Sequence, residues 1–335
     1  FFGDLVPEIE KRGYTPLVFG PVSGGAQTLR RCAGHRSFPI LRLEQCAEVR
    51  ELWELFCRAL RLRVRGFEVR GRLDLDGLDL SALVREDLAQ NLRESRYFND
   101  WLFYAGARGL FRRVRVEAFY LPFENMARDR MLLLAARAAA PQAVVIGYQH
   151  AALTPQHLNF RIGEAEREVL PLPSRIVSTG EAARELMSRW GLPKEGLSVG
   201  CALRQAAAAS VRPYRPVSRP LRLAVMLATS GEEAAEVLRA LDRAFAGRED
   251  APEILVRPHP AIGLAAALGR VRPLGLRFQD GSGKPIEEAW EWADAALYAS
   301  STLGLEAVHR GIPAIFFDTG GFLSVDPLFE SEALK

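Results

Sequence analysis

The residue types best suited to hold a ligand come directly after two short hydrophobic runs in the last third of the chain. Run 294–299 leads into three consecutive hydroxyl residues, Ser300, Ser301 and Thr302, and Glu306 follows about one helical turn later. Because the first turn of a helix offers unpaired backbone N–H groups and a partial positive charge, this pattern suits a bound phosphate. Glu306 then lies within reach of a ribose.

The second run, 253–256, ends in Arg257, Pro258, His259 and Pro260. The two prolines fix the backbone around His259 and prevent it from continuing a helix or a central strand. A rigid loop that presents an imidazole is typical of a binding site. Two strand ends with phosphate-compatible groups in one α/β unit predict a nucleotide site at the carboxyl edge of a parallel sheet.

Hydroxyl residues at strand-to-helix junctions also have a purely structural interpretation. Ser and Thr are preferred N-caps, so the run at 300–302 could do no more than cap a helix. A third junction carries the same ambiguity, because strand 221–227 is followed by Thr229, Ser230 and a glycine. Small side chains there suit close approach of the backbone to a ligand, but such turns are common.

Two more strand ends, in the first half of the chain, carry polar clusters. These are Glu124 and Asn125 after strand 115–121, and Gln149 and His150 after strand 143–147. Such ends share the edge at which open α/β sheets bind ligands. A Glu or His there could deprotonate a hydroxyl, because a side chain that titrates near the working pH is the best general base. Alternatively, Glu124 and Asn125 cap helix 126–140, and His150 has only a loop or capping role.

Several common catalytic motifs are absent from the sequence. It contains neither GxxxxGK[ST] nor GxGxxG followed by an acidic residue, which disfavours P-loop hydrolysis and NAD binding. It also lacks the GxSxG elbow of α/β-hydrolases. The five histidines are scattered and no DxD-type acidic pair follows a strand. We therefore expect neither a metal site nor a bound cofactor.

Composition is typical of a soluble globular protein, with 48% hydrophobic and 25% charged residues. The formal net charge is +3, from 44 basic and 41 acidic residues, and no basic stripe with interleaved aromatics indicates nucleic-acid binding. The four cysteines form no CxxC motif, which predicts reduced thiols. With no run of about 18 apolar residues and no signal peptide visible, we expect a cytoplasmic protein.

Strand-like and helix-like segments alternate along most of the chain, which predicts parallel sheets with right-handed crossovers. The expected strands are 16–20, 115–121, 143–147, 175–178, 197–199, 221–227, 253–256, 276–278, 294–299 and 312–317. The expected helices are 4–13, 47–63, 83–110, 126–140, 181–190, 231–246, 261–269, 285–292 and 302–310. In helix 83–110 we expect a buried face of Leu88, Leu92, Phe98, Trp101, Leu102 and Tyr104.

At 335 residues the chain is long enough for two domains. Residues 204–220 are rich in Ala and Pro with little periodicity, which predicts a linker. We therefore expect an α/β fold of two Rossmann-like domains, over 1–203 and 221–335, that face each other across a cleft. Because the chain begins with Phe1 inside a helix-like segment, we also expect trimmed termini and a missing first strand.

At these residues the sequence resembles bacterial glycosyltransferases of surface carbohydrate biosynthesis with the GT-B fold. Phe123-Glu124-Asn125 resembles their Tyr-Glu-Asn strand end, and Gly147-Tyr148-Gln149-His150 their Gly-x-Gln-His loop. More distantly, the chain is similar to CMP-Kdo transferases, bacterial sialyltransferases and CDP-glycerol polymerases. Those groups share a His-Pro and a Ser-Ser motif, matched by His259-Pro260 and Ser300-Ser301. The likeness covers residues 115–317.

The resemblance implies metal-independent transfer of a sugar from a CMP- or CDP-activated donor to a surface glycan or glycolipid, as in capsule or lipopolysaccharide synthesis. The C-terminal domain would bind the donor and the N-terminal domain the acceptor. In the polymerases the base comes from a His-Gly loop, which implies His150 as the base here, although Ala151 replaces that glycine. In other relatives the base is an acidic residue, so Glu124 is the alternative base. The implied donor contacts are Arg257, His259, Pro260, Ser300, Ser301, Thr302, Glu306, Thr229 and Ser230, and the acceptor-side contacts are Asn125 and Gln149.

Two other classes of function share this two-domain shape. A non-hydrolysing sugar-nucleotide epimerase would release an altered sugar nucleotide without an acceptor, and a catalytically silent binding protein would keep only the fold. As partners we expect a nucleotide sugar and a glycan or glycolipid acceptor but no nucleic acid, with peripheral contact to the inner membrane allowed. The sequence leaves the oligomeric state open.

Overall fold

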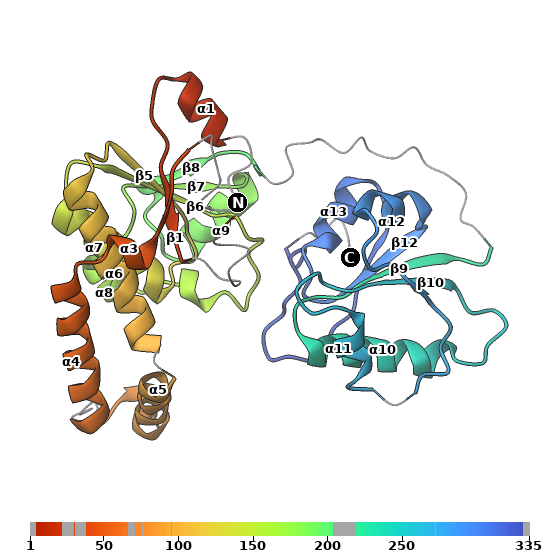
Figure 1. Cartoon of the computed structure of the whole chain (residues 1–335). Coiled ribbons are helices and arrows are strands. Elements are labelled where there is room, and N and C mark those ends of the chain that lie inside the picture. The colour runs from red at the N-terminus through yellow and green to blue at the C-terminus, as the bar shows by residue number, and fades with distance from the viewer. Residues whose placement is uncertain are drawn as a thin grey trace. The chain divides into compact units, whose positions relative to one another are not determined.

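The computed structural model describes residues 5–21, 30, 38–65, 71–75, 77–94, 96–203, 219–271 and 273–330. The chain divides into two compact units. The first comprises residues 1–150 and 159–204, and the second comprises 151–158 and 205–335. Each contains a parallel β-sheet with helices packed against it (Figure 1). Apart from its last two positions, the expected linker 204–220 lies outside the described residues.

Four parallel strands form the sheet of the first unit, in the order β5-β6-β7-β8. The strands are β5 (Ala118–Pro122), β6 (Val144–Tyr148), β7 (Arg175–Ser178) and β8 (Leu197–Val199), and the helices between them are α7 (Ala127–Ala139), α8 (Glu164–Val169) and α9 (Glu181–Arg189). Pro122 pairs with Tyr148, so β5 and β6 end side by side. The N–H of Phe123 donates to the carbonyl of Tyr148 at 2.8 Å. The polar loops that follow these strands therefore start at one edge of the sheet.

The N-terminal part of the first unit is mostly helical. Its elements are α1 (Leu5–Lys11), β1 (Val18–Gly20), β2 (Ile40–Arg42), α3 (Leu43–Cys46), α4 (Val49–Arg65), β3 (Asp74–Leu75), β4 (Leu78–Asp79), α5 (Ser81–Arg93) and α6 (Arg96–Arg113). Strands β1 and β2 pair in parallel. The ring of Phe19 in β1 lies 5.8 Å from that of Phe119 in β5 and 6.0 Å from that of Phe111 in α6. These contacts join the β1–β2 pair to the main sheet and to α6.

Helix α6 packs against α3 through glycines. A Cβ added at Gly106 would lie 2.6 Å from the carbonyl oxygen of Leu43, and one added at Gly109 would lie 2.1 Å from that of Cys46. The expected single helix over 83–110 is wrong, because the chain forms α5 and α6 there. All six large residues of its expected buried face are only half-buried, whereas the buried residues of α6 are Ala105, Gly106, Ala107, Gly109, Leu110 and Phe111. A hydrophobic pattern marks the largest side chains, and here the closest packing occurs where side chains are smallest.

The second unit contains a five-stranded parallel sheet in the order β11-β10-β9-β12-β13. Its elements are β9 (Arg222–Met226), α10 (Gly231–Phe245), β10 (Glu253–Arg257), α11 (Leu264–Leu268), β11 (Gln279–Asp280), α12 (Ile286–Trp292), β12 (Ala295–Tyr298), α13 (Leu303–His309) and β13 (Ala314–Phe316). The short strand expected over 276–278 lies at 279–280 instead, as β11. The backbone N–H of Leu276 donates to the carboxylate of Asp242 at 2.8 Å, and its side chain is buried in the core.

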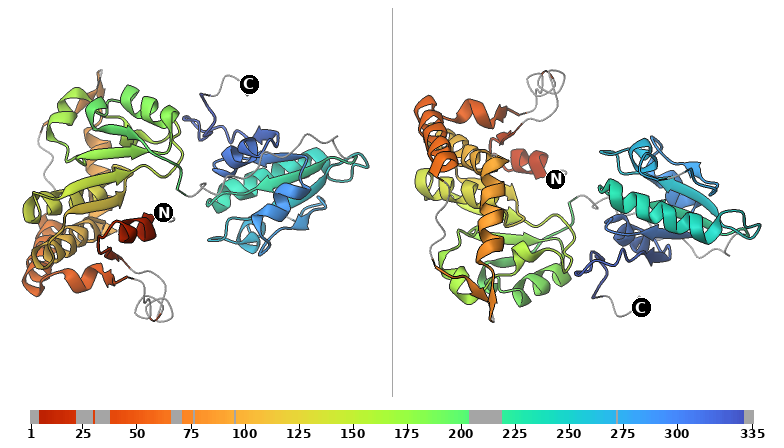
Figure 2. Two further views of the ribbon diagram at one scale, coloured as in Figure 1. Left: turned by 90° about the horizontal axis from the view of Figure 1, so that it is seen from above. Right: turned by 90° about the horizontal axis from the view of Figure 1, so that it is seen from below.

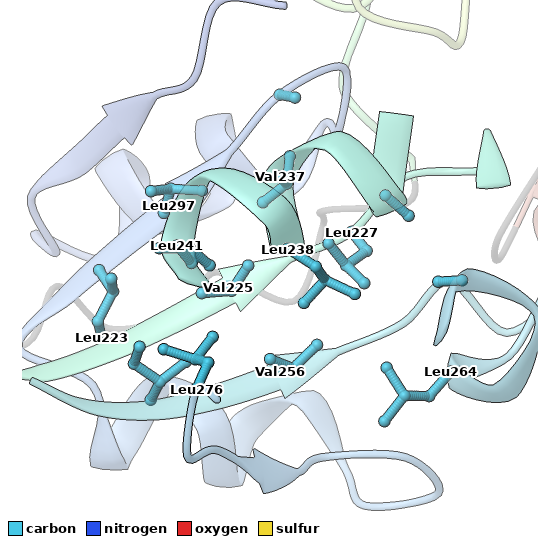
Figure 3. Packing of buried hydrophobic residues seen from close by; sticks show 14 of the residues in the cluster. Leu223, Val225, Leu227, Val237, Leu238, Leu241, Val256, Leu264, Leu276 and Leu297 are labelled. Carbon is cyan, nitrogen blue, oxygen red and sulfur yellow. The ribbon is translucent and has the colours of Figure 1, made fainter. Parts of the chain in front are cut away.

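Both faces of this sheet are covered. Leu223, Val225 and Leu227 pack with α10 and α11 on one face, while Ala224 and Met226 pack with α12 and α13 on the other. Figure 1 shows the two helix pairs on opposite sides of the strands. Helix α10, in teal, runs along the sheet in the right-hand view of Figure 2, and Figure 3 shows Leu238 and Leu241 against Val225. Burial on both faces explains why the strands of this unit are almost continuously hydrophobic.

The order of the strands creates a switch point in the second sheet. From β9 the chain moves outward to β10 and β11, then crosses to the other side of β9 to form β12 and β13. The loops after β9 and β12 therefore lead away in opposite directions. In open α/β sheets such a point leaves a crevice beyond the carboxyl ends of the strands, where ligands bind. The prediction of an α/β fold with two Rossmann-like domains is confirmed.

Candidate functional site

In the first unit, the ends of β5 and β6 bring Glu124 and His150 together. Nε2 of His150 lies 3.6 Å from Oε1 of Glu124. The other carboxylate oxygen of Glu124 pairs with Arg128, so each oxygen faces a basic side chain. The side chain of His150 is 8% exposed and that of Glu124 is 26% exposed. The two alternative bases from the sequence thus form one pair at the carboxyl edge of the sheet.

The turn that carries Glu124 is held by a buried carboxylate. Oδ2 of Asp129 accepts hydrogen bonds from the backbone N–H groups of Glu124, at 2.9 Å, and Met126, at 3.2 Å. Burial raises the pKa of Asp129, although the two backbone donors and Arg128 act in the opposite direction. Met126, rather than Glu124 or Asn125, is the N-cap residue of α7. The capping interpretation of Glu124 and Asn125 is therefore wrong.

Asn125 and Gln149 fix the two loops in place. Asn125 has φ 54°, a left-handed conformation that asparagine tolerates better than most residues, and its Nδ2 donates to the carbonyl of Asn159 at 2.6 Å. The amide of Asn159 donates in return to the carbonyl of Glu124. Oε1 of Gln149 accepts from the N–H and the hydroxyl of Thr179, at 3.0 and 3.1 Å. The side chains of Asn125 and Gln149 are both buried, so they hold the loops that carry Glu124 and His150 from inside the protein.

In the second unit, the carboxylate of Glu233 occupies both donors of Ser300. Oε1 accepts from the backbone N–H of Ser300 at 3.2 Å, and Oε2 accepts from its hydroxyl at 2.6 Å. Ser230 is the N-cap of α10, and its hydroxyl accepts from the N–H of Glu233 at 3.3 Å. The loops after β9 and β12 are therefore linked across the switch point.

Ser301 and Thr302 lie at the start of α13. The hydroxyl of Ser301 accepts from the N–H of Leu303 at 3.3 Å, while Thr302 is the N-cap residue and makes no capping hydrogen bond with its side chain. Thr302 and Thr229 are exposed. Of the hydroxyl run, only Ser301, the residue before the N-cap, bonds to the helix start, whereas the donors of Ser300 bind Glu233.

Arg257 and Glu306 hold neighbouring elements. Nη1 of Arg257 donates to the carbonyl of Gly281 at 3.2 Å and to that of Lys284 at 2.7 Å. Oε1 of Glu306 accepts from Nε1 of Trp290 at 2.8 Å and from Nε of Arg310 at 3.1 Å. These contacts tie β10 to the loop after β11, and α13 to α12.

His259 and Pro260 lie in the loop after β10, one strand away from the switch point. Nδ1 of His259 accepts from the backbone N–H of Ala261 at 3.2 Å, which places the ring proton of a neutral imidazole on Nε2. Because β9 lies between β10 and β12, the loops of His259 and Ser300 are not neighbours. The loop of Thr229 and Ser230 starts between them.

A hollow lies at the switch point of the second unit. Ser230 and Glu233 line it from the start of α10, Ser300 from the end of β12, and Asp318, Thr319 and Phe322 from the segment after β13. Sequence reasoning missed Glu233, Asp318 and Phe322. The Ser-x-x-Glu spacing of 230–233 is a capping-box signal, but in a capping box the carboxylate would bond back to the N-cap. Here it bonds to Ser300.

No model of a known protein family matches the chain, and no curated protein matches it in sequence. Solved structures do resemble it. The UDP-GlcNAc 2-epimerase of Neisseria meningitidis bound to UDP-GlcNAc is 11% identical with a TM-score of 0.47, and the match covers 94% of this chain and 84% of that one. MurG of Acinetobacter baumannii is 12% identical with a TM-score of 0.47, covering 95% and 75%.

The lipopolysaccharide outer core galactosyltransferase WaaB, in its apo form, is 10% identical with a TM-score of 0.41, covering 90% of this chain and 79% of that one. With TM-scores below 0.5, these similarities assign no function to this chain.

Proposed function

We propose that this protein is a glycosyltransferase that moves a sugar from a nucleotide-activated donor to a glycan acceptor. The proposal assigns the donor to the second unit and the acceptor to the first. The observation that carries it is the Glu124–His150 pair at the carboxyl edge of the first sheet. An acceptor hydroxyl needs a base as it attacks, and a carboxylate beside an imidazole is a common way to build one.

In the proposed reaction the acceptor oxygen forms a bond to the anomeric carbon of the donor while the bond from that carbon to the phosphate breaks. The hydroxyl proton passes to the carboxylate of Glu124, the more exposed member of the pair, and the nucleotide leaves as an anion. Nε2 of His150 faces this carboxylate and Nδ1 is buried, so the imidazole holds the base in place. Arg128 holds the second oxygen of Glu124 and so fixes the carboxylate. Asn125 and Gln149 position the two loops on the acceptor side.

On the donor side we propose that phosphate binds along the edge formed by the loops after β9, β10 and β12. His259 can donate from Nε2, Pro260 holds its loop rigid, and Thr229, Ser301 and Thr302 supply hydroxyl groups. Donors aimed at the leaving phosphate would stabilise its growing charge. For Arg257 and Glu306, which bind neighbouring elements through Nη1 and Oε1, we propose structural roles. The resemblance of His259-Pro260 and Ser300-Ser301 favours a CMP- or CDP-linked donor.

For the site of action we propose the cytoplasm, with peripheral contact to the cytoplasmic membrane face through α4. No helix within the described part of the chain has the length and hydrophobicity to cross a bilayer. Along α4, however, Val49, Trp53, Phe56, Leu60 and Val64 are each more than half exposed. Their spacing places them in one stripe of the helix. A helix with an exposed apolar face, tryptophan and arginines is typical of binding at a lipid interface.

The charge of α4 complements an anionic lipid surface. The helix contains five arginines and two glutamates. Arg61 and Arg63 lie near the apolar stripe and are exposed. An acceptor glycan carried on a lipid would then lie on the same surface as the enzyme.

A thermal-shift panel of CMP, CDP, UDP and GDP tests the donor assignment. We expect the cytidine nucleotides to raise the melting temperature most, because bound ligand stabilises the folded state by mass action. The matching sugar nucleotide is then incubated with and without glycan acceptors in EDTA. Acceptor-dependent release of the nucleotide supports the transferase. Conversion of the sugar nucleotide without an acceptor would identify an epimerase, and no shift with any nucleotide would leave a non-catalytic protein.

A further inference from the structure

We infer that the hollow at the β9–β12 switch point binds vicinal hydroxyl groups of a sugar ring, and that Glu233 is the residue that recognises them. This inference builds on the proposed function, since the ring belongs to the nucleotide sugar. It differs from the expectation that Ser300 holds phosphate. Three observations carry it: the partner of Ser300, the charge of the hollow, and an exposed aromatic ring.

Ser300 is already bound to an anion of the same chain. Its N–H and hydroxyl, the two groups that would hold a phosphate oxygen, both donate to the carboxylate of Glu233. The N–H of Glu233 donates to Ser230, which anchors the residue at the start of α10. A phosphate at Ser300 would therefore have to displace a carboxylate or bind beside it. Like charges at that distance repel.

The rest of the hollow does not offset this negative charge. Asp318 brings a second carboxylate to its lining, and among the described residues that line it none is lysine or arginine. The guanidinium of Arg270 lies beside Gly231 at the start of α10, and it pairs at 3.7 Å with the exposed Glu232. The hollow therefore favours a neutral ligand rich in hydrogen-bond donors over an anion.

Sugar hydroxyls fit this set of groups. An ionised carboxylate only accepts hydrogen bonds and has room for several, so Glu233 can hold Ser300 and still accept from a pair of ring hydroxyls. The hydroxyls of Ser230, Ser300 and Thr319 can donate or accept as needed. Phe322 is fully exposed and lines the same hollow, so its ring can cover the apolar face of a sugar.

The hollow also lies at a suitable place on the sheet edge. Neighbouring strands are about 4.8 Å apart, so the loops after β10 and β13 are separated by roughly 14 Å along the order β10-β9-β12-β13. A ligand extended along this edge can keep its phosphate near His259 and Thr229 while one of its rings lies against Glu233 and Phe322.

The ring is either the ribose or the transferred sugar, and calorimetry separates the two. Wild type and Glu233→Gln are titrated with CMP, CDP, UDP, their 2′-deoxy counterparts, and the sugar nucleotides CDP-glucose and UDP-N-acetylglucosamine. Glu233→Gln should weaken binding about tenfold or more, because hydrogen bonds to a charged group are lost. If the ring is ribose, the 2′-deoxy nucleotides already bind weakly and the variant adds little. If it is the transferred sugar, only the sugar nucleotide is affected.

The control is Glu232→Gln, which removes an exposed carboxylate one residue away that does not line the hollow. It should bind every ligand as wild type does. Phe322→Ala, at a fully exposed position, should weaken binding several-fold without changing the melting temperature. Glu233→Gln keeps the size of the side chain and one acceptor oxygen. If Glu233→Gln fails to fold, Ser300→Ala tests the same hollow by removing the hydroxyl that binds Glu233.

Tighter binding of inorganic pyrophosphate by Glu233→Gln would overturn the inference, because it would mean that the carboxylate blocks an anion site. So would equal losses in the Glu232 and Glu233 variants, or a wild type that binds none of the ligands. Failure of the proposed function is a different result: the wild type binds a sugar nucleotide through Glu233 but transfers no sugar to any acceptor.

Discussion

Nε2 of His150 lies 3.6 Å from Oε1 of Glu124, and so the two residues that the sequence offers as alternative bases lie side by side in the structure. They come from the ends of neighbouring strands, β5 and β6, whose register places Pro122 opposite Tyr148. Parallel pairing alone therefore brings the two side chains to one edge.

A paired acid and base predict non-additive effects on turnover. His150→Ala and Glu124→Ala should each lower kcat roughly 100-fold or more, because each removes part of the same proton acceptor. The double variant should lose little beyond the more severe single one, since residues that act as a unit are not additive. Donor affinity, measured by calorimetry, should change less than twofold. Independent, multiplying losses in kcat would contradict a pair.

Asp129 should make stability fall as pH rises. Burial raises its pKa in the folded state above the unfolded value of 3.8, so the folded state binds the proton more tightly. Its contribution is therefore fully present below about pH 3.8 and is lost as pH rises through the folded pKa. Asp129→Asn cannot titrate and has nearly the same shape. Urea unfolding of both proteins between pH 4 and 7 isolates this contribution.

The free energy of unfolding of wild type minus that of Asp129→Asn should decrease with pH in this range. Groups that titrate elsewhere cancel in the difference. A difference that increases with pH would mean that the hydrogen bonds from Glu124 and Met126 outweigh burial and that the folded pKa is lowered.

Local rules predicted most elements of the two sheets but not the partners of their polar side chains. Strands β7 and β8 lie where the hydrophobic runs predicted them, because a run of hydrophobic residues indicates directly that its own segment is buried. The partner of Glu233 is different. It lies 67 positions away in sequence, and only the crossover that places β12 beside β9 brings it close.

For Glu306 the sequence predicted the position of the side chain correctly, but it did not predict the partners of its carboxylate. Its position in the first turn of α13 was predicted from the run that ends at 299, and that placement holds. The prediction of a ribose contact rested on this position and on the resemblance to known transferases. The structure adds Trp290 and Arg310, which take up the carboxylate. Sequence spacing shows where a side chain starts, whereas its hydrogen bonds depend on what the fold packs against it.

The close contact of α6 with α3 predicts that its glycines tolerate no side chain. Gly106→Ala and Gly109→Ala should each destabilise the protein by about 2 kcal/mol or more, because the added Cβ meets backbone carbonyls that are fixed within α3. In an exposed helix the same change would stabilise by up to about 1 kcal/mol. Gly196→Ala, where an added Cβ meets nothing within 4 Å, is the control. Chemical denaturation measures all three; unchanged stability at both helix positions would contradict the packing.

The exposed apolar stripe of α4 predicts binding to anionic membranes. Wild type should sediment with vesicles of phosphatidylcholine and phosphatidylglycerol, and it should bind poorly to vesicles of phosphatidylcholine alone. Its binding to the mixed vesicles should weaken at high salt, because salt screens the attraction between the arginines and the anionic lipid. Trp53→Ser combined with Phe56→Ser should abolish sedimentation, because it removes two stacked aromatic rings from the stripe, whose centroids are 5.8 Å apart.

Leu83→Ser is the matched control, because Leu83 is equally exposed but lies on α5, outside the stripe. It should bind vesicles as wild type does, which separates a specific surface from general hydrophobicity. The rival occupant of the stripe is a second copy of the chain. Light scattering decides between the two. If wild type is a dimer that does not bind vesicles, and the Trp53 and Phe56 changes convert it to a monomer, then α4 forms a protein interface. That result would remove the support for membrane contact.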